Sequence, residues 1–239
     1  MSELMILPPN GKYRDISQTS SSFKTRLLKQ LLAENLFTAC NFFSHEECES
    51  WLNYCNTIGF TEIKANATYE SAKRYHGRIQ IRSEDVAASI FRRLMPFMPN
   101  DFDGHAPVGC NSDIRLYRYT SGQSFGKHVD GSIEDNEGRG ETKFTVLIYL
   151  TGAKESNVSS EDPTAAANAL RGGETIFYSD CTSISKGKSK KTIEKLLVSV
   201  RPQAGMLLAH AHGDRCLTHE GAPVTSGIKY VLRTDVVYG

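Results

Sequence analysis

The chain has 239 residues, enough for one large domain or two small ones with a sizeable core. Lysine and arginine total 28 against 27 acidic residues, so the net charge of +1 argues against a whole-surface contact with nucleic acid or an anionic membrane. The apolar runs are too short to span a bilayer, and the start lacks the basic and long apolar regions of a secretory signal.

The first part of the chain is predicted to be mainly helical. Residues 1–22 are rich in Pro, Gly, Ser and Thr without a period, and we expect them to form a flexible arm. Residues 23–34 carry four leucines at helical spacing, which predicts a short amphipathic helix. Ser44 and Glu47 form the S-x-x-E pattern of a capping box at the start of a second helix, and Ser83 precedes a third helix that prolines end.

From about residue 110 the pattern changes to that of short strands bounded by Gly, Pro, Asn and Ser. The predicted strands are 114–119, 144–151, 175–178, 196–201, 206–210 and 228–238. Because no long helical pattern lies between them, an antiparallel sandwich or barrel is expected. The predicted fold class is therefore α+β with a mainly β core. We expect a single domain over 23–239, with helical support at 23–100 and strands from about 110 to 239.

Two polar inserts interrupt the strands. Residues 155–169 are rich in Ser and Ala and are expected to form a surface loop, whereas 185–195 hold five lysines. The lysine-rich insert fits a solvated hairpin tip, a nuclear-import signal or a contact for an acidic partner.

The six cysteines are expected to be reduced thiols, most of them buried. No pair has the C-x-x-C spacing of a zinc ribbon or a redox site. Together with the missing secretory signal, this predicts a cytoplasmic or nuclear protein without a membrane partner.

The histidines suggest a metal site. His128 and Asp130 are two positions apart, so on a strand they share a face and can take adjacent positions around a metal. His219 offers a third ligand, and two His with one carboxylate form the facial triad of non-haem Fe(II) oxygenases, which leaves open positions on the iron. His210 and His212 also share a strand face and could form a three-His zinc site with His219 instead.

Two cations stand on one face of the last predicted strand. Lys229, Arg233 and Asp235 project together there. If this face is buried, each cation needs an anion. Asp235 can pair with one cation and leave the other for the carboxylate of a ligand. The alternative is that these charges face water on an edge strand.

Four segments resemble the Fe(II)/2-oxoglutarate dioxygenases of the prolyl 4-hydroxylase type. The match covers roughly residues 110–238. YTSGQSFGKHVD at 119–130 resembles the Y-x-x-G-q-x-F/Y-x-x-H-x-D signature, and GGETIF at 172–177 resembles G-G-E-T-x-F. VRPQAGMLL at 200–208 resembles V-x-P-x-x-G-x-L-L, and HEGAPVTSGIK at 219–229 resembles H-x-x-x-P-V-x-x-G-x-K.

This resemblance implies a double-stranded β-helix (jelly-roll) core with N-terminal supporting helices, and Fe(II) bound by His128, Asp130 and His219. It implies hydroxylation of a C–H bond with O₂ and 2-oxoglutarate, release of succinate and CO₂, and ascorbate as the reductant. The expected substrate is a peptide or protein side chain such as proline. A small molecule, a modified nucleobase, an inactive jelly-roll binding module and a structural zinc protein remain alternatives. The charged segments 74–82 and 130–139 are expected to flank the mouth of the site.

The resemblance also implies which residues hold 2-oxoglutarate. Lys229 matches the position that binds its C5 carboxylate, Tyr149 a position whose hydroxyl also reaches that carboxylate, and Tyr119 lines the same pocket. The last strand, KYVLRTDVVY, departs from the apolar strand ending in Trp that related proteins usually have. Arg233 is therefore a second candidate for the carboxylate or for the substrate, and Arg115 a weaker candidate for the substrate.

Overall fold

The computed structural model describes residues 5–9, 28–68, 72–152, 169–183 and 191–239. The strands are β1 (Leu28–Ala33), β2 (Leu36–Cys40), β3 (Thr61–Ala65), β4 (Arg74–Arg82), β5 (Pro107–Cys110), β6 (Asp113–Tyr119), β7 (Ser124–His128), β8 (Glu141–Tyr149), β9 (Arg171–Gly172), β10 (Thr175–Ser183), β11 (Lys191–Val200), β12 (Leu207–Ala211), β13 (His219–Gly221), β14 (Val224–Ser226) and β15 (Lys229–Tyr238). The helices are α1 (His45–Ile58) and α2 (Glu84–Leu94), with 3-10 turns η2 (Met95–Phe97) and η3 (Gly213–Arg215).

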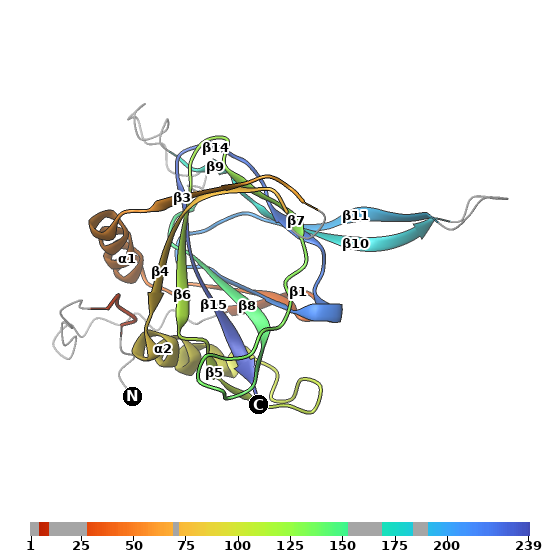
Figure 1. Ribbon diagram of the computed structural model, residues 1–239, viewed down its shortest axis with the longest axis horizontal. Helices are drawn as coiled ribbons and strands as arrows, with labels where there is room; N and C mark the ends of the chain where they lie inside the picture. Colours follow the sequence, from red (N-terminus) through yellow and green to blue (C-terminus); the bar gives the residue numbers. More distant parts are fainter. Residues whose placement is uncertain (1–4, 10–27, 69–71, 153–168, 184–190) are drawn as a thin grey trace.

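The strands form two layers that β4 joins. One layer runs in the order β1-β2-β12-β8-β15-β6-β4, and the chain of hydrogen-bonded strands continues from β4 through β7, β13 and β10 to β11. β4 pairs with β6 over most of its length and with β7 through Arg74 and Tyr75. All these pairings are antiparallel, and the result is the jelly-roll expected from the sequence (Figure 1).

The two helices cover the outer face of the larger layer, beside β4 and β6 (Figure 1). Trp51 of α1 and Ile90 of α2 are buried in one core with Leu116 of β6 and Leu232 of β15. A second apolar cluster fills the space between the layers and includes Phe177. The functional site described below lies on this inner side.

Both later helices were predicted correctly from their caps. Ser44 Oγ accepts a hydrogen bond from the Glu47 N–H (3.1 Å), and the Ser44 N–H donates to Glu47 Oε2 (2.7 Å), which completes the capping box. The Ser83 hydroxyl accepts from the Val86 N–H at the start of α2 (3.3 Å).

The predicted helix at 23–34 is wrong where the structure describes it. Residues 28–33 form β1, which pairs with β2 around a turn at Asn35. Leu31 is 66% exposed, so the leucines do not form one buried stripe. The helical support at 23–100 is also only partly correct, because β1 to β4 lie within it alongside α1 and α2.

The strands predicted after residue 110 are confirmed, with β10 and β11 longer than expected and projecting as a hairpin (Figure 1). Residues 191–195 of the lysine-rich insert belong to β11, while the rest of that insert and 155–168 of the other lie outside the described residues. Of the predicted arm, residues 5–9 are described, and the Ile6 carbonyl accepts from Trp51 Nε1 (2.9 Å). The five described cysteine side chains are free thiols, and no described helix is long and apolar enough to cross a membrane.

Candidate metal and cosubstrate site

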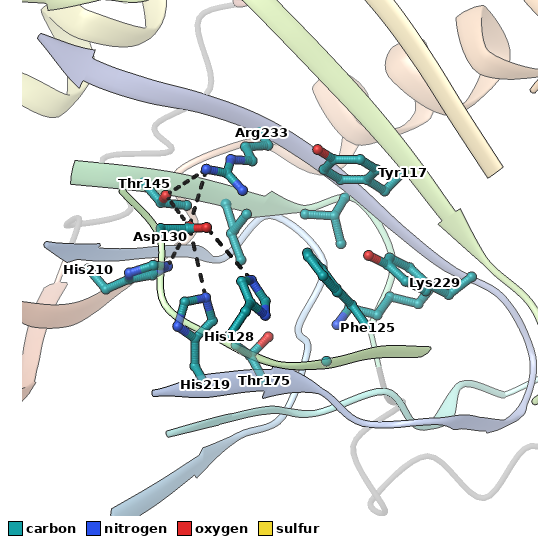
Figure 2. Close-up of a pocket in the computed structure, with 14 residues that line it drawn as sticks. Tyr117, Phe125, His128, Asp130, Thr145, Thr175, His210, His219, Lys229 and Arg233 are labelled. Carbon is teal, nitrogen blue, oxygen red and sulfur yellow. Dashed lines mark hydrogen bonds and ion pairs between the residues drawn. The ribbon is translucent and has the colours of Figure 1, made fainter. Parts of the chain in front are cut away.

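Strand register brings His128 and His219 together. They are direct partners between β7 and β13, and Asp130 follows two residues after His128. His128 Nε2 lies 3.7 Å from Asp130 Oδ1, and His219 Nε2 lies 3.9 Å from Asp130 Oδ2 (Figure 2). The ligand atoms of the three residues all lie within 4.8 Å of one another, and we call these residues the triad.

The protonation state of the triad suits a divalent metal. His128 Nδ1 lies 2.8 Å from the Gly126 carbonyl, and His219 Nδ1 lies 2.9 Å from the Leu217 carbonyl. A carbonyl only accepts, so each Nδ1 carries the proton, and each Nε2 keeps a lone pair that a metal held by the Asp130 carboxylate could accept. Burial lowers the pKa of His128 and brings that of His219 to about 4, which keeps both rings neutral.

The Asp130 carboxylate is held ionised and in place. Burial acts to raise the pKa of Asp130, but the charge of Arg233 holds it well below its usual range. Arg233 Nη2 lies 3.2 Å from Asp130 Oδ2, and the Thr145 hydroxyl donates to the same oxygen (2.7 Å). Two imidazole nitrogens and one carboxylate, each oriented by a second group, fit the facial ligand set of Fe(II). Thr145 was not predicted as a site residue, because no sequence motif distinguishes it from the other residues of β8.

A third imidazole, His210 of β12, lies beside the triad. Its Nε2 is buried without a hydrogen-bond partner among the described residues, 3.7 Å from Asp130 Oδ2. His212 instead contacts Thr145 Oγ1 through Nε2 (2.8 Å), so the three imidazoles of the zinc alternative do not converge. The residue that lies near both His210 and His219 is Cys216 rather than His212. Its Sγ is 3.8 Å from His210 Nδ1 and 3.9 Å from His219 Nδ1.

Lys229 lies at the opposite end of the same pocket from the triad, with Phe125 between them (Figure 2). The Lys229 side chain is buried and donates to the Gly173 carbonyl (2.6 Å). Its Nζ stands 5.5 Å and 5.4 Å from the ring centroids of Tyr119 and Tyr149. Within the described part of the chain Lys229 has no ion pair, and burial lowers its pKa to about 8. A buried cation without an anion is costly, so this end of the pocket favours an anionic ligand.

Three residues with hydroxyl groups, Tyr149, Thr175 and Tyr119, lie at the Lys229 end of the pocket. Tyr149 Oη is 2.7 Å from Thr175 Oγ1, and Thr175 lines the pocket. Tyr119 is the register partner of Lys229 across β6 and β15 and also lines the pocket. Thr175 was not predicted as a site residue, although it belongs to the GGETIF segment. The space between the lining residues, together with the open solvent at its mouth, amounts to about 460 Å³.

Arg233 is not placed with Lys229. Its Nη2 contacts Asp130, Asp235 Oδ1 (3.1 Å) and Thr145 Oγ1 (3.0 Å), at the triad end of the pocket. Arg115, the weaker candidate, pairs with Asp113 (2.8 Å). The two cations of the last strand therefore lie in different surroundings, one neutralised and one not.

Comparison with known proteins supports this fold. No family model and no curated protein matches the chain. Among solved structures, it is similar to a viral collagen prolyl hydroxylase from Paramecium bursaria Chlorella virus 1 in a 2-oxoglutarate complex, with 20% identity over 84% of this chain and 95% of that one and a TM-score of 0.52. A Trichoplax adhaerens prolyl hydroxylase, in complex with a peptide fragment of the hypoxia inducible factor oxygen degradation domain, matches at 16% identity over 87% and 86%, with a TM-score of 0.54. At these identities the likeness shows the fold, and it confirms the double-stranded β-helix expected from the sequence.

Proposed function

We propose that this protein is an Fe(II)- and 2-oxoglutarate-dependent dioxygenase of the prolyl 4-hydroxylase type. One observation carries the proposal: a single pocket has a two-histidine, one-carboxylate triad at one end and, at the other, a buried ammonium group that forms no ion pair with any described residue. Neither end alone is specific, because histidine clusters also bind zinc. The combination matches a ligand that binds a metal at one end and carries a carboxylate at the other.

In this proposal His128, Asp130 and His219 hold the iron, which with O₂ and 2-oxoglutarate supplies the oxidation of a C–H bond and the release of succinate and CO₂. Lys229 binds the C5 carboxylate of 2-oxoglutarate as a charge-assisted pair, and the Tyr149 and Thr175 hydroxyls supply further hydrogen bonds. Arg233 and Thr145 act through Asp130. They fix its carboxylate and so keep a triad ligand in place.

For the substrate we propose a protein or peptide side chain such as proline. Tyr117 and Phe125 are half-buried residues that line the pocket, and their rings offer flat apolar surfaces for a proline ring. The Trichoplax structure holds a peptide, which supports a peptide substrate on this fold. Ascorbate as the reductant of the iron, and a cytoplasmic or nuclear location, belong to the same proposal.

The test begins with ligand binding. Calorimetry with Mn(II), a redox-stable substitute for Fe(II), should show metal binding and then metal-dependent binding of 2-oxoglutarate. With Fe(II), the protein should release succinate slowly even without substrate. Asp130→Ala is the matched inactive control, because it removes a ligand and leaves the pocket walls. Zinc binding without 2-oxoglutarate binding would contradict the proposal and favour the structural zinc alternative.

The substrate is then identified by mass spectrometry. Candidate proline peptides, free amino acids and nucleosides are incubated with the Fe(II) enzyme and searched for a product heavier by one oxygen atom. A product on a nucleoside or free small molecule alone would contradict the peptide assignment while leaving the dioxygenase chemistry intact.

A further inference from the structure

The register of β4 places two arginines on the same sheet face as two residues that line the pocket. Arg78 is the direct partner of Tyr117 on β6, and Arg74 is the direct partner of Phe125 on β7. Directly opposed residues of an antiparallel pair project to the same face of the sheet. Because Tyr117 and Phe125 line the pocket, both arginine side chains stand on its face. Buried His76 lies between them on β4, and its ring contacts Tyr117 with a centroid distance of 5.0 Å.

These arginines differ from their neighbours in having no acidic partner. Arg115 pairs with Asp113 (2.8 Å), and Arg82 pairs with Glu137 (3.2 Å). Among the described residues, neither Arg74 nor Arg78 has an ion pair or a hydrogen bond from its guanidinium group, although both are half-buried. Arg74 stands over the ring of Phe125, with its guanidinium carbon 5.7 Å from the centroid.

We propose that the substrate is an acidic peptide segment whose carboxylates pair with Arg74 and Arg78. This rests on the proposed function and deepens it. The two arginines are four residues apart on one strand, so their Cα atoms are about 13 Å apart. An extended peptide lying along β4 spans that distance in four residues. Two acidic residues four positions apart, with the modified residue between them over the pocket, fit both cations.

The length of the cationic surface favours a peptide over a nucleic acid. Beyond Arg78, the same face of β4 carries Gln80, whose amide donates to Asp113 Oδ1 (2.7 Å), and Arg82, which Glu137 neutralises. A nucleic acid strand, with one phosphate per nucleotide, would meet these carboxylates as soon as it extended past the arginines. Two isolated carboxylates meet no such repulsion.

The test uses three fluorescein-labelled probes measured by anisotropy with Mn(II) and 2-oxoglutarate in the absence of oxygen. The first is a short extended peptide with a central proline and two Asp residues four positions apart. The second has Asn in place of both Asp residues, and the third is a thymidine oligonucleotide. The variants are Arg74→Gln, Arg78→Gln and the double variant. Arg92→Gln is the matched control, because Arg92 is exposed on α2 and bonds only within its own helix. Thermal unfolding checks each fold.

The wild type should bind the Asp peptide about tenfold more tightly than the Asn peptide, and added salt should weaken that preference. The double variant should lose the preference, while Arg92→Gln keeps it. Equal binding of the two peptides by the wild type, or an unchanged preference in the double variant, would overturn the inference. Tighter binding of the oligonucleotide through the same arginines would also overturn it.

Failure of this inference is distinguishable from failure of the proposed function. Succinate release and 2-oxoglutarate calorimetry test the dioxygenase without any peptide, whereas anisotropy tests the charge preference without turnover. A protein that releases succinate but shows no charge preference refutes this inference alone. A charge preference in a protein that never binds 2-oxoglutarate refutes the proposed function.

Discussion

Replacing Lys229 with Met should have opposite effects on cosubstrate binding and on stability. If Lys229 anchors the C5 carboxylate, the variant loses one partner of a buried charge-assisted pair. Such a loss costs about 3 kcal/mol, so the Kd for 2-oxoglutarate should rise on the order of 100-fold. Met has a similar length and no charge, so the pocket wall is preserved.

The stability effect follows from the burial of an unpaired cation. Burial lowers the pKa of Lys229 from 10.5 to about 8, so the protonated side chain costs the folded state about 3 kcal/mol at neutral pH. The variant also loses the hydrogen bond to the Gly173 carbonyl, which offsets about 1–2 kcal/mol of this. Without ligand, Lys229→Met should therefore be more stable than the wild type by about 1–2 kcal/mol.

The pH dependence has a definite sign. The unfolded chain holds the Lys229 proton more tightly than the folded chain, so the penalty is fully present below pH 8 and is relieved as the pH rises towards 10.5. The stability advantage of the Met variant should shrink over that window. The affinity of the wild type for 2-oxoglutarate should fall above about pH 8, because the neutral amine no longer pairs with a carboxylate.

Calorimetry with Mn(II) and urea unfolding at neutral and alkaline pH measure both effects. Lys143→Met is the control, because Lys143 pairs with the exposed Glu141 on the surface of β8 and its loss should cost less than about 1 kcal/mol. A Lys229→Met protein that is less stable than the wild type and binds 2-oxoglutarate equally well would refute the reasoning. Lys229 would then be a structural cation satisfied by the Gly173 carbonyl.

Three further substitutions test the metal end of the pocket and one tests the helical support. Asp130→Ala should abolish Mn(II) binding in calorimetry, and retained affinity would mean that the metal site lies elsewhere. Arg233→Met should weaken Mn(II) binding about tenfold or more through the loosened Asp130, and a change confined to the Kd for 2-oxoglutarate would instead make Arg233 a carboxylate anchor. His210→Phe should cost less than tenfold in metal affinity because His210 stands outside the triad, and loss of the metal would favour a zinc site that includes it. Glu47→Gln should destabilise the fold in urea by about 3 kcal/mol, since it leaves the Arg93 guanidinium without its buried carboxylate, and an unchanged midpoint would show that this pair is not needed.

The sequence indicated His128 and Asp130 by their spacing on a strand, and His219 by its match to a family pattern. His128 ends β7 and His219 begins β13, and the two residues are direct register partners. Gly122 precedes β7 with a φ of 79°, and Gly227 precedes β15 with a φ of 70°. Turns that need a positive φ fix where strands start, and thereby which residues become partners. The caps of α1 and α2 were predictable because capping depends on residues that are close in sequence.

The N-terminal strands could not be recognised in this way, because their stability comes from distant partners. Among the described strands β1 lies at an edge with β2 alone beside it, and its leucine spacing also suits a helix. β4 carries basic residues on its pocket face and isoleucines on the face towards the helices. Polar residues therefore dominate its sequence, and it was not predicted as a strand. Such a strand is recognisable only when the pocket-facing side of the sheet is known.

The choice between Lys229 and Arg233 shows most clearly what the sequence alone cannot settle. Both stand on one face of β15, four residues apart, and both are cations. Their surroundings differ because Asp130, from the loop after β7, and Asp235 reach Arg233, whereas no described carboxylate forms an ion pair with Lys229.

Because of this difference, the two ends of the pocket carry opposite charge. At the triad end, two carboxylates and one guanidinium leave an excess negative charge, which attracts a divalent metal. At the other end, an unpaired ammonium attracts a carboxylate. A keto acid with a second carboxylate can satisfy both ends in one orientation only, with its metal-binding groups at the triad and its remote carboxylate at Lys229. The acidic residues around Arg233 neutralise the competing cation, and this supports our proposal that Lys229 is the anchor.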